Sequence, residues 1–138
     1  MFNRSNFKKL ADFLETLHED QFNMRIFVGN MSLSEEDVNM RTGDHPCGTV
    51  ACAAGWAPAA GILPETTTTH WSDYIRQVFL NGDPRRIAVH PVYDWVFADQ
   101  WSRVDNTPKG AIARIRWMLA GNPIDLPKTQ ETVERYMA

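Results

Sequence analysis

The sequence is poor in cysteine, in net charge and in long apolar runs, and each absence excludes a class of protein. Two cysteines in 138 residues are too few for the disulfide framework of a small secreted domain. No apolar run approaches the roughly 20 residues that cross a bilayer, and the first residues lack the apolar core of a signal peptide. A formal net charge of -3 gives no general attraction to nucleic acid or to anionic membranes. We therefore expect a cytoplasmic protein that binds neither.

What the sequence does contain is the balance of an ordinary globular domain. Hydrophobic residues make up 43% and charged residues 22%, so the chain can bury a core and is not of a disordered composition. Its length corresponds to one domain, which we expect to span residues 1–138. Five tryptophans are the compositional outlier, and large aromatic side chains serve either a core or a binding surface.

Apolar residues recur at helical spacing in several segments, and cap and stop residues bound them. Ser5 is the expected cap of the first helix, whose apolar positions run from Phe7 to Leu17. The clearest helix has Thr107 as its cap and Pro108 at its first position, and it ends at Gly121. Further helices are predicted over residues 71–79 and from 91 to about 96, with short helical turns over 32–40 and 130–136.

No segment shows a strong alternation of β-branched residues bounded by hairpin turns. The apolar connector over residues 22–27 could be extended, but it is too short to argue for a sheet. We therefore predict an all-α fold, a compact single domain of five or six short helices around a central helix of small residues.

That central helix carries the most specific motif of the chain. Both cysteines fall in the string Cys47-Gly48-Thr49-Val50-Ala51-Cys52-Ala53-Ala54-Gly55-Trp56. Thr49 is its expected N-cap, and Pro58 ends or kinks the helix near Trp56. Because Ala51 to Ala57 bring almost no side chain, we expect neighbouring helices to pack closely against this segment. The small side chains would also let a ligand reach the backbone of this segment.

The motif also contains the candidate chemistry. Cys47 precedes a helix N-terminus, where the dipole favours thiolate over thiol, and His45 or His90 could act as its base. This makes a Cys47-dependent enzyme one alternative. A zinc-stabilised domain is a weaker one, with His45, Cys47 and Cys52 as ligands and His70 or His90 as a fourth, because structural zinc usually has two paired spacings. We expect both cysteines to be buried thiols, with no metal and no cofactor.

The second candidate region combines tryptophan with arginine in the C-terminal half. Its members, taken as a binding surface for a partner, are Trp95, Trp101, Arg103, Arg114 and Trp117. Arginine interleaved with tryptophan can stack on ligands or dominate a protein contact. Asp94, Asp99 and Asp105 lie among them, so internal ion pairs are the alternative interpretation.

Three stretches together resemble a known group. The Cys-Gly-Thr-x-x-Cys-x-x-Gly signature of residues 47–55 resembles one found in small, uncharacterised bacterial and phage proteins. Phe22-Asn23-Met24, and the stretch from Trp101 through Thr107-Pro108 to Ala113-Arg114-Ile115 and Gly121, are similar as well. The resemblance implies a small, phage-encoded domain in the host cytoplasm, and it implies no activity and no catalytic residue.

Taken together, the sequence favours a non-enzymatic binding protein that recognises a protein partner or a small ligand. In that interpretation the motif residues Cys47, Gly48, Thr49, Cys52, Gly55 and Trp56 are structural. The tryptophan and arginine residues that reach the surface supply the contacts.

Overall fold

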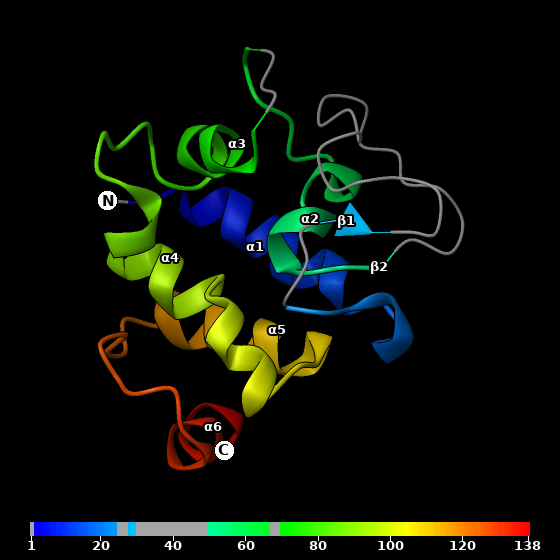
Figure 1. The fold of residues 1–138 in the computed structure, drawn as a ribbon, viewed down its shortest axis with the longest axis vertical. Coiled ribbons are helices and arrows are strands. Elements are labelled where there is room, and N and C mark those ends of the chain that lie inside the picture. Colours follow the sequence, from blue (N-terminus) through cyan, green and yellow to red (C-terminus); the bar gives the residue numbers. More distant parts are fainter. Residues whose placement is uncertain (1, 25–27, 30–49, 67–69) are drawn as a thin grey trace.

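Short helices make up most of the structure, a computed structural model that describes residues 2–24, 28–29, 50–66 and 70–138. The described part contains six α-helices (Figure 1). They are α1 (Arg4–Leu14), α2 (Ala53–Trp56), α3 (Trp71–Val78), α4 (Pro91–Val96), α5 (Pro108–Leu119) and α6 (Gln130–Met137). Four short 3₁₀ helices lie between them in the chain: η1 (Glu19–Gln21), η2 (Pro58–Ala60), η3 (Ile87–Val89) and η4 (Asp99–Arg103). The all-α prediction is confirmed.

One short antiparallel pair accompanies the helices. Strand β1 (Val28–Gly29) pairs with β2 (Val50–Ala51), with Val28 opposite Ala51. This pair corrects the expected start of the small-residue helix, because α2 begins at Ala53 with Cys52 at the N-cap position instead of Thr49. The β-branched Val50 favours the extended backbone that the strand pairing uses. Thr49 itself, like the expected turn over 32–40, lies outside the described residues.

The first helix is capped one residue before it begins. The Asn3 side chain accepts a hydrogen bond from the Asn6 N–H at 3.0 Å, so Asn3 is the cap and the expected cap, Ser5, lies inside the helix. Asn3 also donates its own N–H to the carbonyl of Phe79, which fixes the start of α1 against the end of α3. The cap itself is local, since asparagine is among the preferred N-cap residues. The helix ends at Leu14, one turn before the expected Leu17.

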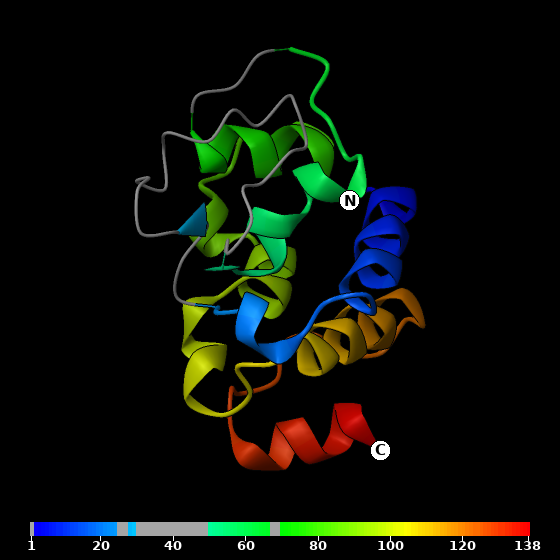
Figure 2. The ribbon, with the colours of Figure 1, turned by 90° about the vertical axis from the view of Figure 1, so that its right-hand side faces the viewer.

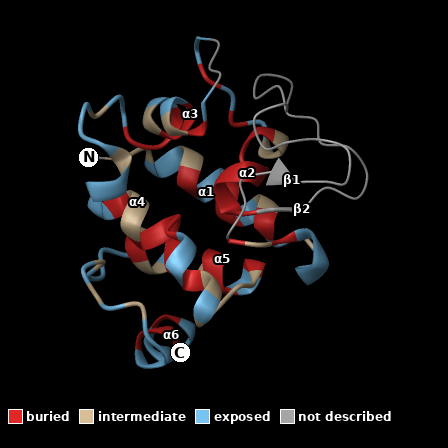
Figure 3. Cartoon of the chain, in the orientation of Figure 1, coloured by how far each residue is buried: buried red, intermediate tan, exposed pale blue. Residues whose placement is uncertain are grey.

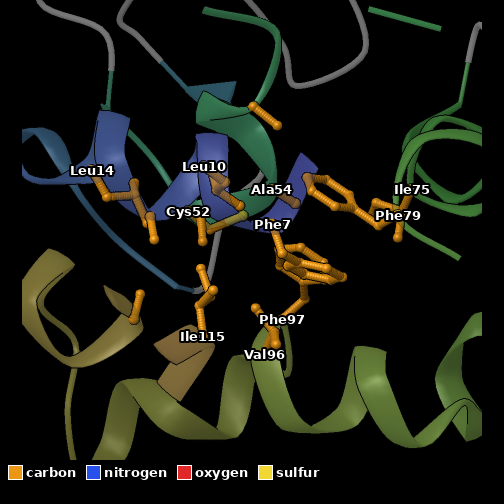
Figure 4. Packing of buried hydrophobic residues seen from close by; sticks show 14 of the residues in the cluster. Phe7, Leu10, Leu14, Cys52, Ala54, Ile75, Phe79, Val96, Phe97 and Ile115 are labelled. Carbon is orange, nitrogen blue, oxygen red and sulfur yellow. The ribbon is translucent and has the colours of Figure 1, made fainter. Parts of the chain in front are cut away.

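The small-residue helix lies in the core, as predicted. Ala53, Ala54 and Ala57 have no exposed surface, and Figure 3 shows α2 as buried along its length. In the close-up of the core, Leu10 and Leu14 of α1 lie beside Cys52, and Ile115 of α5 approaches from the other side (Figure 4). Alanine side chains leave room for this approach, since a larger residue would hold the helices apart.

The later helices follow the sequence pattern closely. Thr107 caps α5 by accepting the Gly110 N–H at 3.0 Å, Pro108 occupies its first turn, and Gly121 follows it with a left-handed φ of 86°. The cap of α4 was not foreseen: Nδ1 of His90 accepts the N–H of Val92 at 3.2 Å.

Helix α6 lies at one end of the molecule, below α5 in both views (Figures 1 and 2). It buries Thr132, Val133 and Tyr136, and its main helical neighbour is α5. No helix in the described part of the chain has the length and apolarity to span a bilayer.

Candidate functional site

Trp95, Trp101 and Arg114 of the C-terminal half meet in a buried cluster around the Arg114 side chain. The Arg114 side chain has no exposed surface, and its guanidinium carbon lies 4.7 Å from the centre of the Trp101 ring. Nη1 of Arg114 donates to the Tyr136 hydroxyl at 3.0 Å. The cation is thus held between an aromatic face and a helix that arrives 22 residues later in the chain.

Asp105 completes this cluster from the loop before α5. The Tyr136 hydroxyl donates to Oδ2 of Asp105 at 2.7 Å, and the Thr107 hydroxyl donates to Oδ1 at 2.7 Å. Arg114 Nη1 lies 3.7 Å from Oδ2, an ion-pair distance that is too long for a direct hydrogen bond. A carboxylate, two hydroxyls and a guanidinium therefore share one network, which we call the Arg114 cluster.

The two tryptophans of this cluster serve as internal hydrogen-bond donors. Trp95 Nε1 donates to the Arg114 carbonyl at 2.9 Å, and Trp101 Nε1 donates to the Trp95 carbonyl at 2.7 Å. Their rings meet edge to face at 5.3 Å. Both indole N–H groups are satisfied inside the protein, as burial of tryptophan normally requires.

Two donors of the Arg114 side chain stay without a partner among the described residues, Nε and Nη2. Burial lowers the pKa of Arg114, and the hydroxyl of Tyr136 and the carboxylate of Asp105 oppose that effect. The guanidinium stays protonated because its unperturbed pKa is so high. Burial likewise raises the pKa of Tyr136, so its hydroxyl keeps the proton that it donates to Asp105.

The structure separates the five predicted binding residues. Trp95, Trp101 and Arg114 come together, but at most 1% of each is exposed, so in this arrangement they hold the fold and do not face a partner. Arg103 is exposed on η4, and Trp117 is half-buried on α5. Only these last two lie where an outside molecule can reach them.

Trp117 lines an open hollow between α5 and α6, of about 310 Å³. We call it the α5–α6 groove, and its residues are Lys109, Ile112, Ala113, Arg116, Trp117, Tyr136 and Met137. Its apolar members include Met137, one of the few large hydrophobic side chains exposed in the described part of the chain. The hydroxyl end of Tyr136 belongs to the Arg114 cluster, so the buried network and the groove share one wall.

A second hollow, of about 450 Å³, adjoins the groove on the other side of α5. Lys109, Ile112 and Arg116 line both, so these three residues form a ridge between two depressions. The far wall of the second hollow comes from the end of α1 and the following turn, with Glu15 and Glu19. The two depressions form one continuous strip across α5.

The cysteine motif is only partly described. Cys47, Gly48 and Thr49, together with His45, lie outside the described residues. Cys52 and Gly55 are buried in and beside α2, and Trp56 donates its indole N–H to the carbonyl of Gln21 at 2.8 Å. The described half of the motif thus packs in the core, as a structural role requires.

His90, proposed as a base for Cys47, is fully buried at the start of α4. Nδ1 accepts the Val92 N–H, so the neutral ring carries its hydrogen on Nε2. Nε2 lies 3.2 Å from Oδ2 of Asp83, but the two groups are not aligned for a hydrogen bond. Burial, followed by the nearby Arg85 cation, lowers the pKa of His90. In this arrangement both ring nitrogens face protein groups.

Among the described residues, no group of three or more histidine, cysteine, aspartate and glutamate side chains is placed to hold a metal ion. Two of the zinc ligands considered from sequence, His45 and Cys47, lie outside that part of the chain. His70 and His90 stand at the N-caps of different helices, α3 and α4.

Sequence reasoning missed most of the groove and part of the cluster. Lys109 and Arg116 look like ordinary exposed helix positions, and Met137 lies at the end of a helix with no distinctive motif. Asp105 was considered only as an ion-pair partner, and Tyr136 only as the end of a short turn. One signal was available: a glycine inside α5, at Gly110, where any Cβ would overlap the carboxylate of Asp105.

Comparisons with protein-family models, with curated proteins and with solved structures give no significant match to this chain.

Proposed function

We propose that this chain is a non-enzymatic binding protein that holds a segment of a partner protein along the α5–α6 groove. The observation that carries the proposal is the groove itself, an open apolar hollow with walls fixed by internal bonds. The proposal keeps the class of function indicated by sequence and moves the contact surface from the buried tryptophans to the exposed side of α5.

The groove has the composition of a protein contact surface. Ile112, Ala113, Trp117 and Met137 supply apolar area, and aromatic and methionine side chains are enriched where proteins meet. Methionine adapts its flexible side chain to partners of different shape. An exposed methionine beside a half-buried tryptophan therefore gives a partner side chain an apolar area to bury.

The walls are held in place before any partner arrives. Trp117 donates its indole N–H to the Pro123 carbonyl at 2.6 Å, and the guanidinium of Arg135 lies 5.7 Å from the centre of its ring. On the opposite wall, the Tyr136 hydroxyl is fixed by Asp105 and Arg114. A preformed surface loses little conformational entropy on binding, and this favours affinity.

The shape favours a polypeptide over a small molecule. Small-ligand pockets enclose most of the surface of their ligand, whereas the groove is open and continues over the ridge of Lys109, Ile112 and Arg116 into the second hollow. An extended chain can follow such a strip and place one side chain on each side of the ridge.

The experiment is a selection of random 12-residue peptides displayed on phage, carried out with the parent and with an Ala113→Trp variant. Ala113 is half-buried in the groove, so tryptophan there fills the hollow without changing the charge. We expect peptides enriched on the parent to lose binding to the variant. An Ala120→Trp variant, changed at an exposed position after α5, is the control and should bind them normally. Peptides that bind all three proteins equally would refute the proposal.

We propose further that the protein works in the cytoplasm of a bacterium as a phage-encoded product. The resemblance of residues 47–55 to a signature of bacterial and phage proteins supports this setting. The low cysteine content also supports it, because reducing compartments rarely use structural disulfides. Expression of the coding region during phage infection, followed by fractionation of the infected cells, tests it.

A further inference from the structure

The charged side chains that line the α5–α6 groove are all positive. The residues that line it include two cations, Lys109 and Arg116, and no carboxylate. A third cation, Arg135, lies over the Trp117 ring that forms one wall. The carboxylates of the strip, Glu15 and Glu19, line the second hollow, beyond the ridge. The positive charge of the groove is therefore a local feature of a chain whose net charge is negative.

The cations of the groove are available to an incoming partner. Lys109 is exposed and makes no ion pair with any residue that the structure describes. Arg116 lies 2.7 Å from Glu15 and 3.7 Å from Asp12, but half or more of each partner's side chain is exposed. Exposed pairs of this kind contribute only about 0–1 kcal/mol, so a partner carboxylate can take the place of Glu15 at small cost.

Arg135 binds in another way. Its guanidinium packs over the Trp117 ring and keeps donors that a carboxylate can accept, because arginine presents five N–H groups in a fixed fork. Trp117 thus has one cation, Arg135, over its ring and shares the groove lining with a second, Arg116. The apolar residues of the groove can accept a large apolar side chain beside these cations.

From this arrangement we infer that the partner segment is acidic and apolar, with one large apolar side chain in the α5–α6 groove and flanking carboxylates on Lys109, Arg116 and Arg135. The inference rests on the proposed function and adds the chemistry of the occupant. Complementary charges at the rim mainly set the association rate and the choice of partner, while the buried apolar side chain supplies most of the affinity.

The test uses peptides from the same phage selection, synthesised with a fluorescent label and titrated by anisotropy. We expect the enriched peptides to carry a net negative charge around a Leu, Phe, Trp or Met. Lys109→Glu should weaken their binding at least tenfold. Glutamate suits the first turn of a helix, so α5 should keep its stability. When the peptide glutamates are replaced by lysine one at a time, one of these changes, at the position that contacts residue 109, should restore binding to Lys109→Glu and weaken binding to the parent.

The matched control is Arg103→Glu, the same reversal of charge at an exposed residue of η4 that does not line the groove. It should leave the affinity within twofold of the parent. Suppose that Ala113→Trp abolishes binding, but that the peptides are neutral or basic or that Lys109→Glu has no more effect than Arg103→Glu. The groove is then a binding site, and the inference of an acidic partner is wrong. If no selected peptide depends on Ala113, the proposed function itself fails. Concentration-dependent dimerisation of the parent that Ala113→Trp removes would identify a second copy as the occupant and overturn the inference.

Discussion

The hydroxyl of Tyr136 donates a hydrogen bond to Oδ2 of Asp105 across 2.7 Å, and this bond joins the last helix to the loop before α5. The same hydroxyl accepts a bond from Arg114. A single oxygen atom therefore connects a buried carboxylate with a buried guanidinium. Tyr136, which carries that oxygen, also forms part of the groove wall. The position of α6, and with it the shape of the groove, depends on this contact.

Tyr136→Phe should lower the free energy of unfolding by about 1–3 kcal/mol, because it removes the hydrogen bond to Oδ2 of Asp105 and the acceptor for Nη1 of Arg114 inside a buried cluster. Urea denaturation followed by far-UV circular dichroism measures this loss. Tyr93→Phe is the matched control, since the Tyr93 hydroxyl makes no hydrogen bond with any described residue and its removal should cost less than about 0.5 kcal/mol. Equal losses in the two variants would show that the Arg114 cluster contributes no specific stability.

Gly110→Ala should destabilise the protein although alanine is the better helix former by about 1 kcal/mol. A Cβ at this position would overlap the Asp105 carboxylate, which Thr107 and Tyr136 hold by hydrogen bonds. We expect a net loss of about 1–3 kcal/mol, typical of overpacking. Thermal and urea unfolding give the sign, and a stabilised variant would contradict the geometry of this loop.

Capping and stop residues in the sequence predicted the helices well, but the sequence did not predict the contacts between distant segments. Thr107, Pro108 and Gly121 bound α5 because capping and stopping depend on neighbouring residues. The bond between Asn3 and Phe79 that ties the start of α1 to the end of α3, and the pairing of Val50–Ala51 with residues 28–29 that precedes α2, both join distant segments. Neither partner is adjacent in sequence, so periodicity could not reveal them.

The same distinction explains the candidate site. Sequence composition singled out Trp95, Trp101 and Arg114 because tryptophan and arginine dominate binding surfaces. Whether such residues face solvent or one another depends on how α4, η4 and α5 pack, and the structure turns all three inward. The groove residues Lys109 and Arg116 carry no motif, and they become a site only because α6 lies beside them.

The stability of the protein should decrease as the pH falls below about 6.5, because of His90. Its pKa is lowered in the folded protein and near 6.5 in the unfolded chain, so unfolding takes up a proton in this range. The contribution of His90 to the free energy of unfolding is fully present above about pH 6.5, and it is lost as the pH falls toward the pKa of His90 in the folded protein. Protonation of Nδ1 also removes the acceptor that caps α4.

A His90→Asn variant separates this effect from the other titrating groups. Asparagine is a good N-cap residue and does not titrate, so the variant should lose less stability than the parent between pH 7.5 and pH 5.5. Urea denaturation at both pH values measures the two differences. Parallel losses in the parent and the variant would show that His90 does not control the acid sensitivity.

Ala54→Leu should lower the free energy of unfolding by about 1–3 kcal/mol, because the fully buried Ala54 lies where helices pack closely. Ala120→Leu adds the same atoms at an exposed position and should have little effect. Differential scanning calorimetry compares the two. If both variants melt like the parent, the small-residue helix is not tightly packed.

The most direct test of the binding proposal is the indole region of the ¹H–¹⁵N spectrum, which contains the signals of the five tryptophans. Trp117 lines the groove, whereas the indoles of Trp95 and Trp101 are bonded inside the protein. Titration with a peptide selected on the parent should shift the Trp117 signal in proportion to binding and leave those of Trp95 and Trp101 in place. A peptide that binds while the Trp117 signal stays unmoved would contradict the account.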